Sequence, residues 1–316
     1  MATTRNSARV AGATIPVFTS PRGEADVMRA YQTVMDAWPV EYDELTIATS
    51  FGGTHVIASG PRNAPPLVLI HALFATAAAW YRNVETLSSS HRTYCVDVIG
   101  EANKSRPSRP IASMDDFLQW FTELIDGLGI DTLYLVGNSY GGFTGAYYAM
   151  KLPERVHKLV LIGPASTIHS MNPFMWRMFL PKGIYQTAPW LPGLERTMRS
   201  SVDWMHAGLA PDPVWEPLFY ESMKHGRLIN RVFPRVFSKD ELATIQAPVL
   251  LVLGQKEVIY GDVRSAIEAG RELMPDAKVA LIPRAHHITA VAQPELVNEQ
   301  LMRFFADAPI EHLSVE

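Results

Sequence analysis

Short apolar segments alternate with amphipathic segments along most of the chain, and this alternation predicts its elements. Strands are predicted near residues 42–48, 54–59, 67–70, 93–98, 132–136, 158–162, 247–253 and 279–282. Helices are predicted at residues 25–38, near 77–87, at 114–128, directly after 139, at 263–273 and after 294. Strands that alternate with helices are typical of a parallel sheet covered on both faces. We therefore expect an α/β fold with a mostly parallel, twisted sheet.

The alternation stops at about Pro164 and resumes at Ala247, which indicates an inserted segment. Residues 1–21 are predicted to form a flexible N-terminal arm. Residues 22–164 and 247–316 are predicted to form the core, and residues 165–246 a helical cap.

The predicted cap is rich in Met and Trp, with six of the 13 Met and four of the seven Trp residues. Several apolar residues recur there at helical spacing, at Met171, Phe174, Met175, Met178 and Phe179. Most such stripes pack a lid against a core, but Met also adapts to irregular ligands. We expect an apolar substrate pocket lined by Phe74, Met171, Met175, Trp176 and Met178.

The first candidate for chemistry is Ser139, in the run Gly137-Asn-Ser-Tyr-Gly141 between a predicted strand and a predicted helix. A strand–G-x-S-x-G–helix arrangement places the serine on a sharp turn that leaves its hydroxyl exposed, and the glycines give the turn room. The amide of Tyr140 then begins a helix, where it can donate to a developing oxyanion. Ser139 is the predicted nucleophile.

A serine nucleophile needs a base and an orienting acid, which follow it in the order acid, then His, in folds built around this motif. Glu257 comes just after the predicted strand 247–253, and the pair His286-His287 just after the strand 279–282. The candidate nucleophile, acid and base therefore leave the same edge of one sheet. Asp262 is a rival acid, but Asp is favoured at helix N-termini, and we expect it to cap the helix 263–273.

The order of these motifs resembles that of the α/β-hydrolase superfamily from about residue 38 to residue 305. A closer likeness is to bacterial carboxylesterases of the naproxen-ester-hydrolysing type. It is carried by residues 38–40 (WPV), 51–57 (FGGTHVI), 94–97 (YCVD), 99–100 (IG) and 103–107 (NKSRP). The resemblance implies hydrolysis of carboxylic esters, apolar or aryl, through an acyl-enzyme on a Ser139–His287–Glu257 triad. It also implies that no metal or organic cofactor is needed.

The superfamily's pattern bears on two further choices. Its catalytic His precedes a Pro-initiated final helix, and the spacing to Pro294 selects His287 over His286. Its second oxyanion donor lies after the third strand, which places it at the backbone amide of Leu73. Glycine is usual where this chain has Ala72, a departure that raises the question of a weakened oxyanion hole. His71 is expected to brace this loop rather than to act in catalysis.

Composition fits a globular protein of ordinary type, with 316 residues, 47% hydrophobic, 19% charged and a net charge of −4. This mild acidity predicts no nucleic-acid or anionic-membrane partner. No run approaches the ~20 apolar residues of a membrane helix. The lone Cys95 lies in a predicted strand and is expected to be a buried small hydrophobe. We expect a cytoplasmic monomer or homodimer whose partners are a small-molecule ester and water.

Other functions compatible with the same residues stay open. A lactonase, a macrocyclic-ester hydrolase or a C–C bond hydrolase would use the same triad. A ligand-binding receptor on a hydrolase scaffold is a further alternative. Dehalogenases and epoxide hydrolases of this fold attack with a carboxylate, so a serine at position 139 argues against both.

Overall fold

A single twisted sheet forms the centre of the molecule in a computed structural model that describes residues 3–5, 13–173, 176–188 and 190–310. Within those residues, its strands are β1 (Thr3–Arg5), β2 (Tyr42–Thr49), β3 (Gly52–Ser59), β4 (Pro66–Ile70), β5 (Arg92–Val96), β6 (Arg106–Pro107), β7 (Leu133–Asn138), β8 (Val156–Ile162), β9 (Val249–Gly254) and β10 (Lys278–Ile282). Their order is β1-β2-β3-β5-β4-β7-β8-β9-β10, with β6 paired to β3. Strands β5, β4 and β7 to β10 run parallel, whereas β3 is antiparallel to its neighbours. The predicted, mostly parallel sheet is confirmed.

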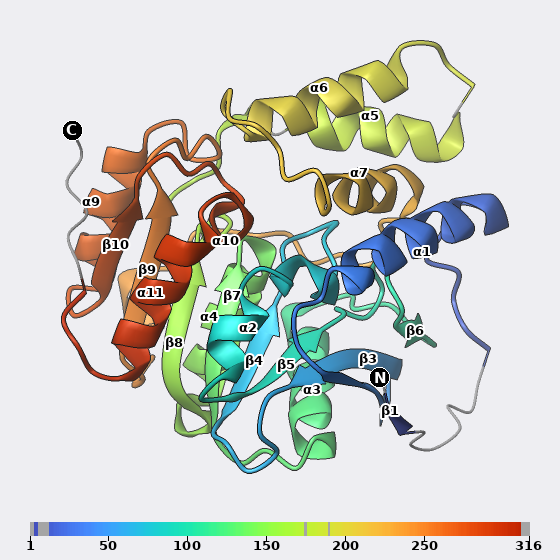
Figure 1. Cartoon of the computed structure of the whole chain (residues 1–316). Helices are drawn as coiled ribbons and strands as arrows, with labels where there is room; N and C mark the ends of the chain where they lie inside the picture. The colour runs from blue at the N-terminus through green and yellow to red at the C-terminus, as the bar shows by residue number, and fades with distance from the viewer. Residues whose placement is uncertain (1–2, 6–12, 174–175, 189, 311–316) are drawn as a thin grey trace.

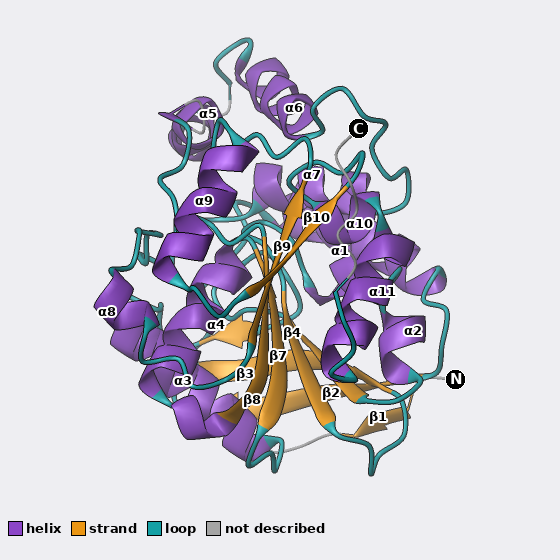
Figure 2. Ribbon diagram, turned by 90° about the vertical axis from the view of Figure 1, so that its left-hand side faces the viewer, coloured by secondary structure: helices purple, strands orange, loops and turns teal. Residues whose placement is uncertain are grey.

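Helices cover both faces of the sheet, as expected for parallel strands that are apolar on both sides. The core helices are α1 (Pro21–Asp36), α2 (Val84–Ser88), α3 (Met114–Gly127), α4 (Tyr140–Lys151), α9 (Val263–Leu273), α10 (Thr289–Ala292) and α11 (Pro294–Phe305), with 3₁₀ turns η1 (Ala77–Trp80) and η2 (Pro153–Arg155). Figure 2 shows α3, α4 and α9 on one side of the sheet and α2 and α11 on the other. Strands β4 (from Leu67), β7 and β9 are buried between these layers, apart from the partly buried Tyr134 of β7.

Two predicted helices differ from the observed ones for local reasons. Helix α1 begins at Pro21 rather than at residue 25, because the Ser20 hydroxyl accepts from the Gly23 amide and Pro is favoured in the first turn. The single helix expected near residues 77–87 is split into η1 and α2. Between them Asn83 turns its side chain inward, where it donates to the Ala290 carbonyl.

The last residues of the predicted N-terminal arm are packed against the rest of the chain. Val17 and Phe18 are buried, and Phe18 forms a β-bridge with Gly226. The Thr19 amide donates to the His225 carbonyl, 2.8 Å away. The chain from residue 13 to 20 is therefore tied to the core and to the inserted segment.

Three helices of the inserted segment lie above one end of the sheet (Figure 1): α5 (Trp176–Thr187), α6 (Leu194–Met205) and α7 (Glu216–His225). The short α8 (Lys239–Leu242) lies instead beside α3 and α4, on one face of the sheet (Figure 2). Met198, Val202 and Met205, at helical spacing, form the buried face of α6 together with Ser201. Met171 precedes α5 without helical structure, so the predicted single stripe from residue 171 to 179 is wrong at its start. Among the described residues, no helix is long and apolar enough to cross a membrane.

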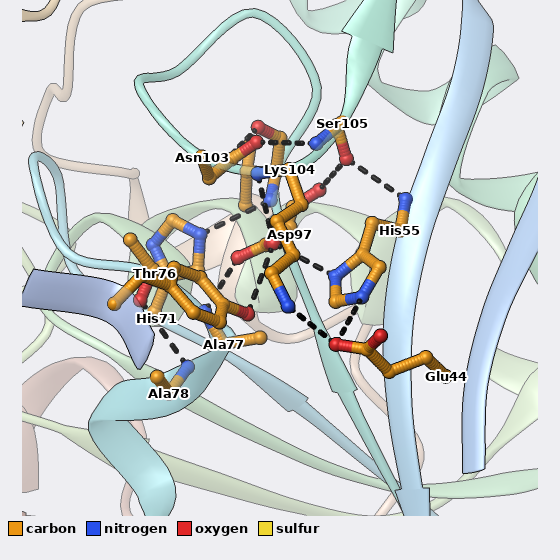
Figure 3. Close-up of polar contacts among 12 residues, drawn as sticks. Glu44, His55, His71, Thr76, Ala77, Ala78, Asp97, Asn103, Lys104 and Ser105 are labelled. Carbon is orange, nitrogen blue, oxygen red and sulfur yellow. Dashed lines mark hydrogen bonds and ion pairs between the residues drawn. The ribbon is translucent and has the colours of Figure 1, made fainter. Parts of the chain in front are cut away.

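A buried polar network ties the edge of the sheet to the loops beside it (Figure 3). The Asp97 carboxylate, fully buried after β5, lies 2.9 Å from His55 Nδ1 on β3. His55 Nε2 lies 3.4 Å from the Glu44 carboxylate of β2, which also pairs with the Lys104 ammonium. The second oxygen of Asp97 accepts from the Ala77 amide at 2.7 Å. The network thus fixes the start of η1 relative to the sheet.

Candidate active site

Ser139 occupies a strained turn between β7 and α4. Its φ of 52° is in the left-handed region that non-glycine residues rarely adopt. A Cβ added at Gly137 would lie 2.2 Å from the Gly141 carbonyl oxygen, and one added at Gly141 would lie 2.3 Å from the Ile70 carbonyl oxygen. Both glycines are therefore required by close backbone approach, as the motif predicted. The backbone of the turn is further held by the Ser139 amide, which donates to Ile162 of β8 at 2.8 Å.

The structure brings Ser139, His287 and Glu257 into one hydrogen-bonded chain. His287 Nε2 lies 2.9 Å from Ser139 Oγ, and His287 Nδ1 lies 2.9 Å from Glu257 Oε2. The other carboxylate oxygen of Glu257 accepts from the Ile259 amide at 3.0 Å, which fixes the carboxylate plane. All three side chains are at least nine-tenths buried. With Nδ1 donating to the carboxylate, Nε2 is left as an acceptor for the serine proton.

Each member of this chain leaves a strand at the same edge of the sheet. Ser139 follows β7, Glu257 lies three residues after β9, and His287 lies five residues after β10. Strand β8 lies between β7 and β9 and ends at Ile162, directly before Gly163. Because parallel strands all end on this side, residues far apart in sequence meet here.

Gly163 packs against the histidine–carboxylate pair, and sequence reasoning missed it. A Cβ there would lie 3.0 Å from Glu257 Oε2 and 3.3 Å from His287 Nδ1, at a φ of 48°. Glycine is thus the residue that leaves room for the pair. A glycine directly after a predicted strand, at the edge already assigned to the site, was the signal that could have found it.

The two rival residues lie outside the Ser139 chain, and Asp262 caps a helix as predicted. Asp262 is exposed and caps α9, accepting from the Arg264 and Ser265 amides at 3.1 and 3.2 Å. His286 points away from the serine: its Nδ1 accepts from the Ile288 amide, and its Nε2 lies 3.3 Å from His206 Nδ1 of the cap. Burial, with the neighbouring His206 and His287, lowers the pKa of His286 to about 3. His286 is therefore a neutral contact between core and cap.

The loop after β4 is braced by His71, as expected. His71 Nδ1 lies 2.8 Å from the Ala72 carbonyl, to which it donates, and its Nε2 accepts from the Val98 amide at 3.0 Å. Burial lowers the pKa of His71, so the ring stays neutral. The strained residue of the loop is Phe74, with a φ of 64°, and Ala72 has no positive φ. An alanine in place of the usual glycine therefore causes no backbone strain here.

The backbone amides of Leu73 and Tyr140 are among those near Ser139 that have no acceptor within the described residues. The close approach of Gly141 to Ile70, and to the His71 carbonyl, places the start of α4 against the loop that carries Leu73. Unpaired amides at a buried turn are costly unless a ligand or water accepts from them. These are the two amides predicted to form an oxyanion hole.

A small cavity of about 10 Å³, room for about one water molecule, adjoins the site. Its lining includes immediate neighbours of the predicted site residues, Ala72, Asn138 and Ile288, together with the indoles of Trp80 and Trp215. Trp215 comes from the cap, so cap and core share this wall. Sequence reasoning noted the excess of Trp in the cap but missed Trp215 as the one beside the site.

The predicted pocket residues have different fates. Phe74 is buried and its ring lies 6.2 Å from that of Phe179 in α5, which links the loop after β4 to the cap. Met171 is partly buried against the core. Trp176 is 68% exposed, and its ring meets that of Phe179 edge-on, so its place in a pocket stays a prediction. Met175, and the side chain of Met178, lie outside the described residues.

One group of side chains in the described part of the chain has the spacing of metal ligands: Asp26, Glu221 and His225, whose ligand atoms lie within 4.8 Å of one another. It joins α1 to α7 and includes no member of the Ser139 chain. Asp26 is also paired with Arg22 and Arg29, so ion pairing accounts for the cluster.

Comparisons with known proteins show which family the chain resembles. A family model described as alpha/beta hydrolase fold matches residues 65–209. The Bacillus subtilis protein named "uncharacterized carboxylesterase nap" is 34% identical over 88% of this chain and 92% of its own length. Carboxylesterase YbfK of the same organism is 33% identical over 87% of this chain and 92% of its own. The crystal structure of naproxen esterase (carboxylesterase NP) from Bacillus subtilis superimposes with a TM-score of 0.80 at 32% identity, covering 90% of this chain and 99% of that one.

Proposed function

This chain belongs to the α/β-hydrolase superfamily, in the family of the Bacillus carboxylesterases, and we propose that it hydrolyses carboxylic esters through a Ser139–His287–Glu257 triad. The observation that carries the proposal is the continuous contact from Ser139 Oγ to His287 and on to Glu257, at 2.9 Å for each step. Nucleophile, base and orienting acid are recognised by this geometry rather than by sequence position.

The reaction proceeds by acyl transfer in two steps. His287 Nε2 takes the Ser139 proton as the serine oxygen attacks the ester carbonyl, and the carbonyl oxygen becomes an oxyanion held by the amides of Leu73 and Tyr140. Collapse of this intermediate breaks the bond to the alcohol, which leaves with the proton from His287. Water then attacks the acyl-enzyme in the same way and releases the acid and the free serine.

Glu257 has the electrostatic task in both steps. Its carboxylate holds His287 Nδ1 as a donor and stabilises the imidazolium that forms when the proton arrives. The Ile259 amide occupies the other carboxylate oxygen and so leaves Oε2 in place for the imidazole. A triad member held on both sides loses little entropy as the reaction proceeds.

The substrates are proposed to be apolar or aryl esters. Support comes from the apolar lining beside Ser139, from the Phe74–Phe179 contact between loop and cap, and from the name of the solved relative, a naproxen esterase. Likeness to meta-cleavage product hydrolases at 21% identity concerns the fold alone and does not favour C–C bond cleavage here.

A chromogenic ester assay tests the proposal. Turnover of 4-nitrophenyl butyrate is expected for the parent and is expected to disappear in Ser139→Ala. The matched control is Ser166→Ala, another buried serine with a positive φ of 54°, whose hydroxyl contacts no histidine within the described chain. Equal turnover by parent and Ser139→Ala would contradict the proposal.

A further inference from the structure

Three hydrogen bonds connect the loop that carries the Leu73 amide to the loop after β5. At its start, His71 Nε2 accepts from the Val98 amide, and at its end the Ala77 amide donates to Asp97 (Figure 3). In its middle, the Phe74 amide donates to Glu101 Oε2 at 3.0 Å. The first two bonds involve residues in the buried polar network or beside it. The third joins the tip of the loop to one isolated carboxyl.

Phe74 is the residue of this loop whose conformation most needs support. Its φ of 64° is unfavourable for a bulky side chain. The Ala75 amide donates to the Ala72 carbonyl at 3.0 Å, which closes a turn with Leu73 and Phe74 at its centre. The orientation of the peptide between these two residues is therefore set by the acceptor that the Phe74 amide finds, and that acceptor is Glu101.

The burial of the Glu101 carboxyl costs free energy that its hydrogen bonding does not offset. Its side chain is buried, and among the described residues Oε1 has no hydrogen-bond partner. The Asp97 carboxylate meets His55 and three further donors, the Tyr31 hydroxyl and the amides of Ala77 and Lys104. Among the described residues, the Glu101 carboxyl accepts only from the Phe74 amide. A buried carboxyl without a cation is unfavourable, and such groups concentrate at functional sites.

We propose that Glu101 is a positioning residue for the oxyanion hole: its carboxyl holds the Phe74 amide, and thereby the turn that directs the neighbouring Leu73 amide at the substrate oxygen. The inference rests on the proposed function, because it concerns the same site. The inference also bears on whether Ala72, in place of the usual glycine, weakens the oxyanion hole. The conformation of the loop is set by the carboxyl of Glu101 from the neighbouring loop and not by a glycine at position 72.

The protonation state of Glu101 gives this role a signature. Burial raises the pKa of Glu101 to about 8, the Phe74 amide opposes the rise, and Asp97 adds to it. The titratable groups that face it are Asp97 from its own loop and Tyr140 from α4, whose pKa it raises in turn. At neutral pH the carboxyl is mostly uncharged. As pH rises through about 8 it becomes a carboxylate, and its negative charge opposes the oxyanion that forms beside Phe74.

Steady-state kinetics of the full chain on 4-nitrophenyl butyrate, from pH 6 to 10, test the inference with two variants. Glu101→Gln keeps an oxygen for the Phe74 amide and cannot ionise. It is expected to retain kcat within about threefold at pH 7 and to lose the alkaline decline that the parent shows near pH 8. Glu101→Ala removes the acceptor. Its kcat is expected to fall at least ~10-fold, with KM changed less than about twofold. Removal of a whole oxyanion-hole donor typically lowers kcat by ~10²–10³-fold.

Two results would overturn the role of Glu101: an alkaline decline unchanged in Glu101→Gln, or a kcat of Glu101→Ala equal to that of the parent. Thermal unfolding of both variants is measured alongside. Should Glu101→Ala fail to fold, the pH profile of Glu101→Gln decides alone. Ser139→Ala separates this inference from the proposed function. If Ser139→Ala is inactive and the Glu101 variants behave like the parent, only the inference fails, whereas an active Ser139→Ala refutes the proposed function itself.

Discussion

Two buried histidines of this protein, His287 and His55, each lie 2.9 Å from a buried carboxylate, yet their opposite ring nitrogens meet different groups. His287 Nε2 faces the Ser139 hydroxyl on a strained turn, beside two unpaired amides. His55 Nε2 faces the Glu44 carboxylate, which is itself paired with Lys104. A carboxylate–histidine pair is therefore not a catalytic signature by itself. Whether such a histidine can act as a base depends on the group that its other ring nitrogen faces.

The electrostatics of His55 follow from this placement. Burial alone would lower the pKa of His55, but hydrogen bonds to Asp97 and Glu44 outweigh it and raise the pKa above its ordinary value. The hydrogen bond from His55, assisted by Lys104, lowers the pKa of Glu44 to about 2. When His55 is protonated, the network is thus a chain of alternating charges. Such a chain stabilises the fold and has no group free to accept a proton from a nucleophile.

The sharpest contrast should come from removing each histidine in turn. His287→Gln is expected to lower kcat by about 10⁴-fold or more, because Ser139 loses its base, with the protein folded as before. His55→Gln is expected to leave kcat of the folded protein within a few fold. Ester turnover and circular dichroism of the two variants check this. A dead His55→Gln that is fully folded would show that the two histidines are not separable in this way.

The proposed role of Glu257 as the acid can be tested with Asp262 as its control. Glu257→Gln keeps the shape but not the charge, and is expected to lower kcat/KM by up to ~10⁴-fold, as the matching Asp-to-Asn change does in a serine protease. Glu257→Asp should also be poor, because a carboxylate ~1 Å short cannot keep a contact that requires roughly 2.6–3.2 Å. Asp262→Asn is the control and should keep the rate of the parent, since Asn also caps helices. The reverse ranking would mean that Glu257 is not the acid.

The His55 network should act on stability and not on chemistry. Breaking a buried pair by removing one partner costs roughly 3–5 kcal/mol, so the free energy of unfolding of His55→Gln should fall by that order. The deficit should be largest between about pH 4.5 and 6.5. Above that window the raised pKa of His55 is crossed and its contribution is lost. Below it, the contribution of Glu44 is lost as pH falls toward about 2. Chemical denaturation at pH 3, 5.5 and 9 measures this, and a deficit independent of pH would contradict it.

The smallest effect is expected at the histidine next to the base. His286→Ala should lower kcat/KM only a few fold, because it removes the contact with His206 of the cap and no group of the triad. His206→Ala should give a similar loss, since both variants break the same contact. Kinetics of the two single variants and of the double variant measure the coupling. Additive losses would indicate that the contact carries no energy.

The sequence was sufficient to predict what is encoded locally or by strand order. Ser139, Glu257 and His287 each follow an apolar strand, so one parallel sheet necessarily brings their loops to one edge. Asp262 was recognisable as a cap because Asp has a local task at a helix N-terminus.

The remaining features depend on contacts between distant segments, which periodicity does not encode. Glu101 belongs to no recognised sequence motif, and only the fold brings it to the Phe74 amide. The same holds for His206 against His286, and for Gly163 against the triad. The composition of the cap does not encode which of its side chains face inward either: Trp215 is buried, whereas Trp176 is exposed.

The reactivity of Ser139 itself is the most direct test of a functioning triad. The folded protein is treated with a fluorophosphonate, and intact mass and peptide mapping locate the adduct, with Ser139→Ala and His287→Gln as controls. One adduct on Ser139 is expected in the parent, none in Ser139→Ala, and a much slower reaction in His287→Gln, because the serine then lacks its base. Labelling of another serine, or ester turnover that persists with Ser139 unlabelled, would contradict the proposed mechanism.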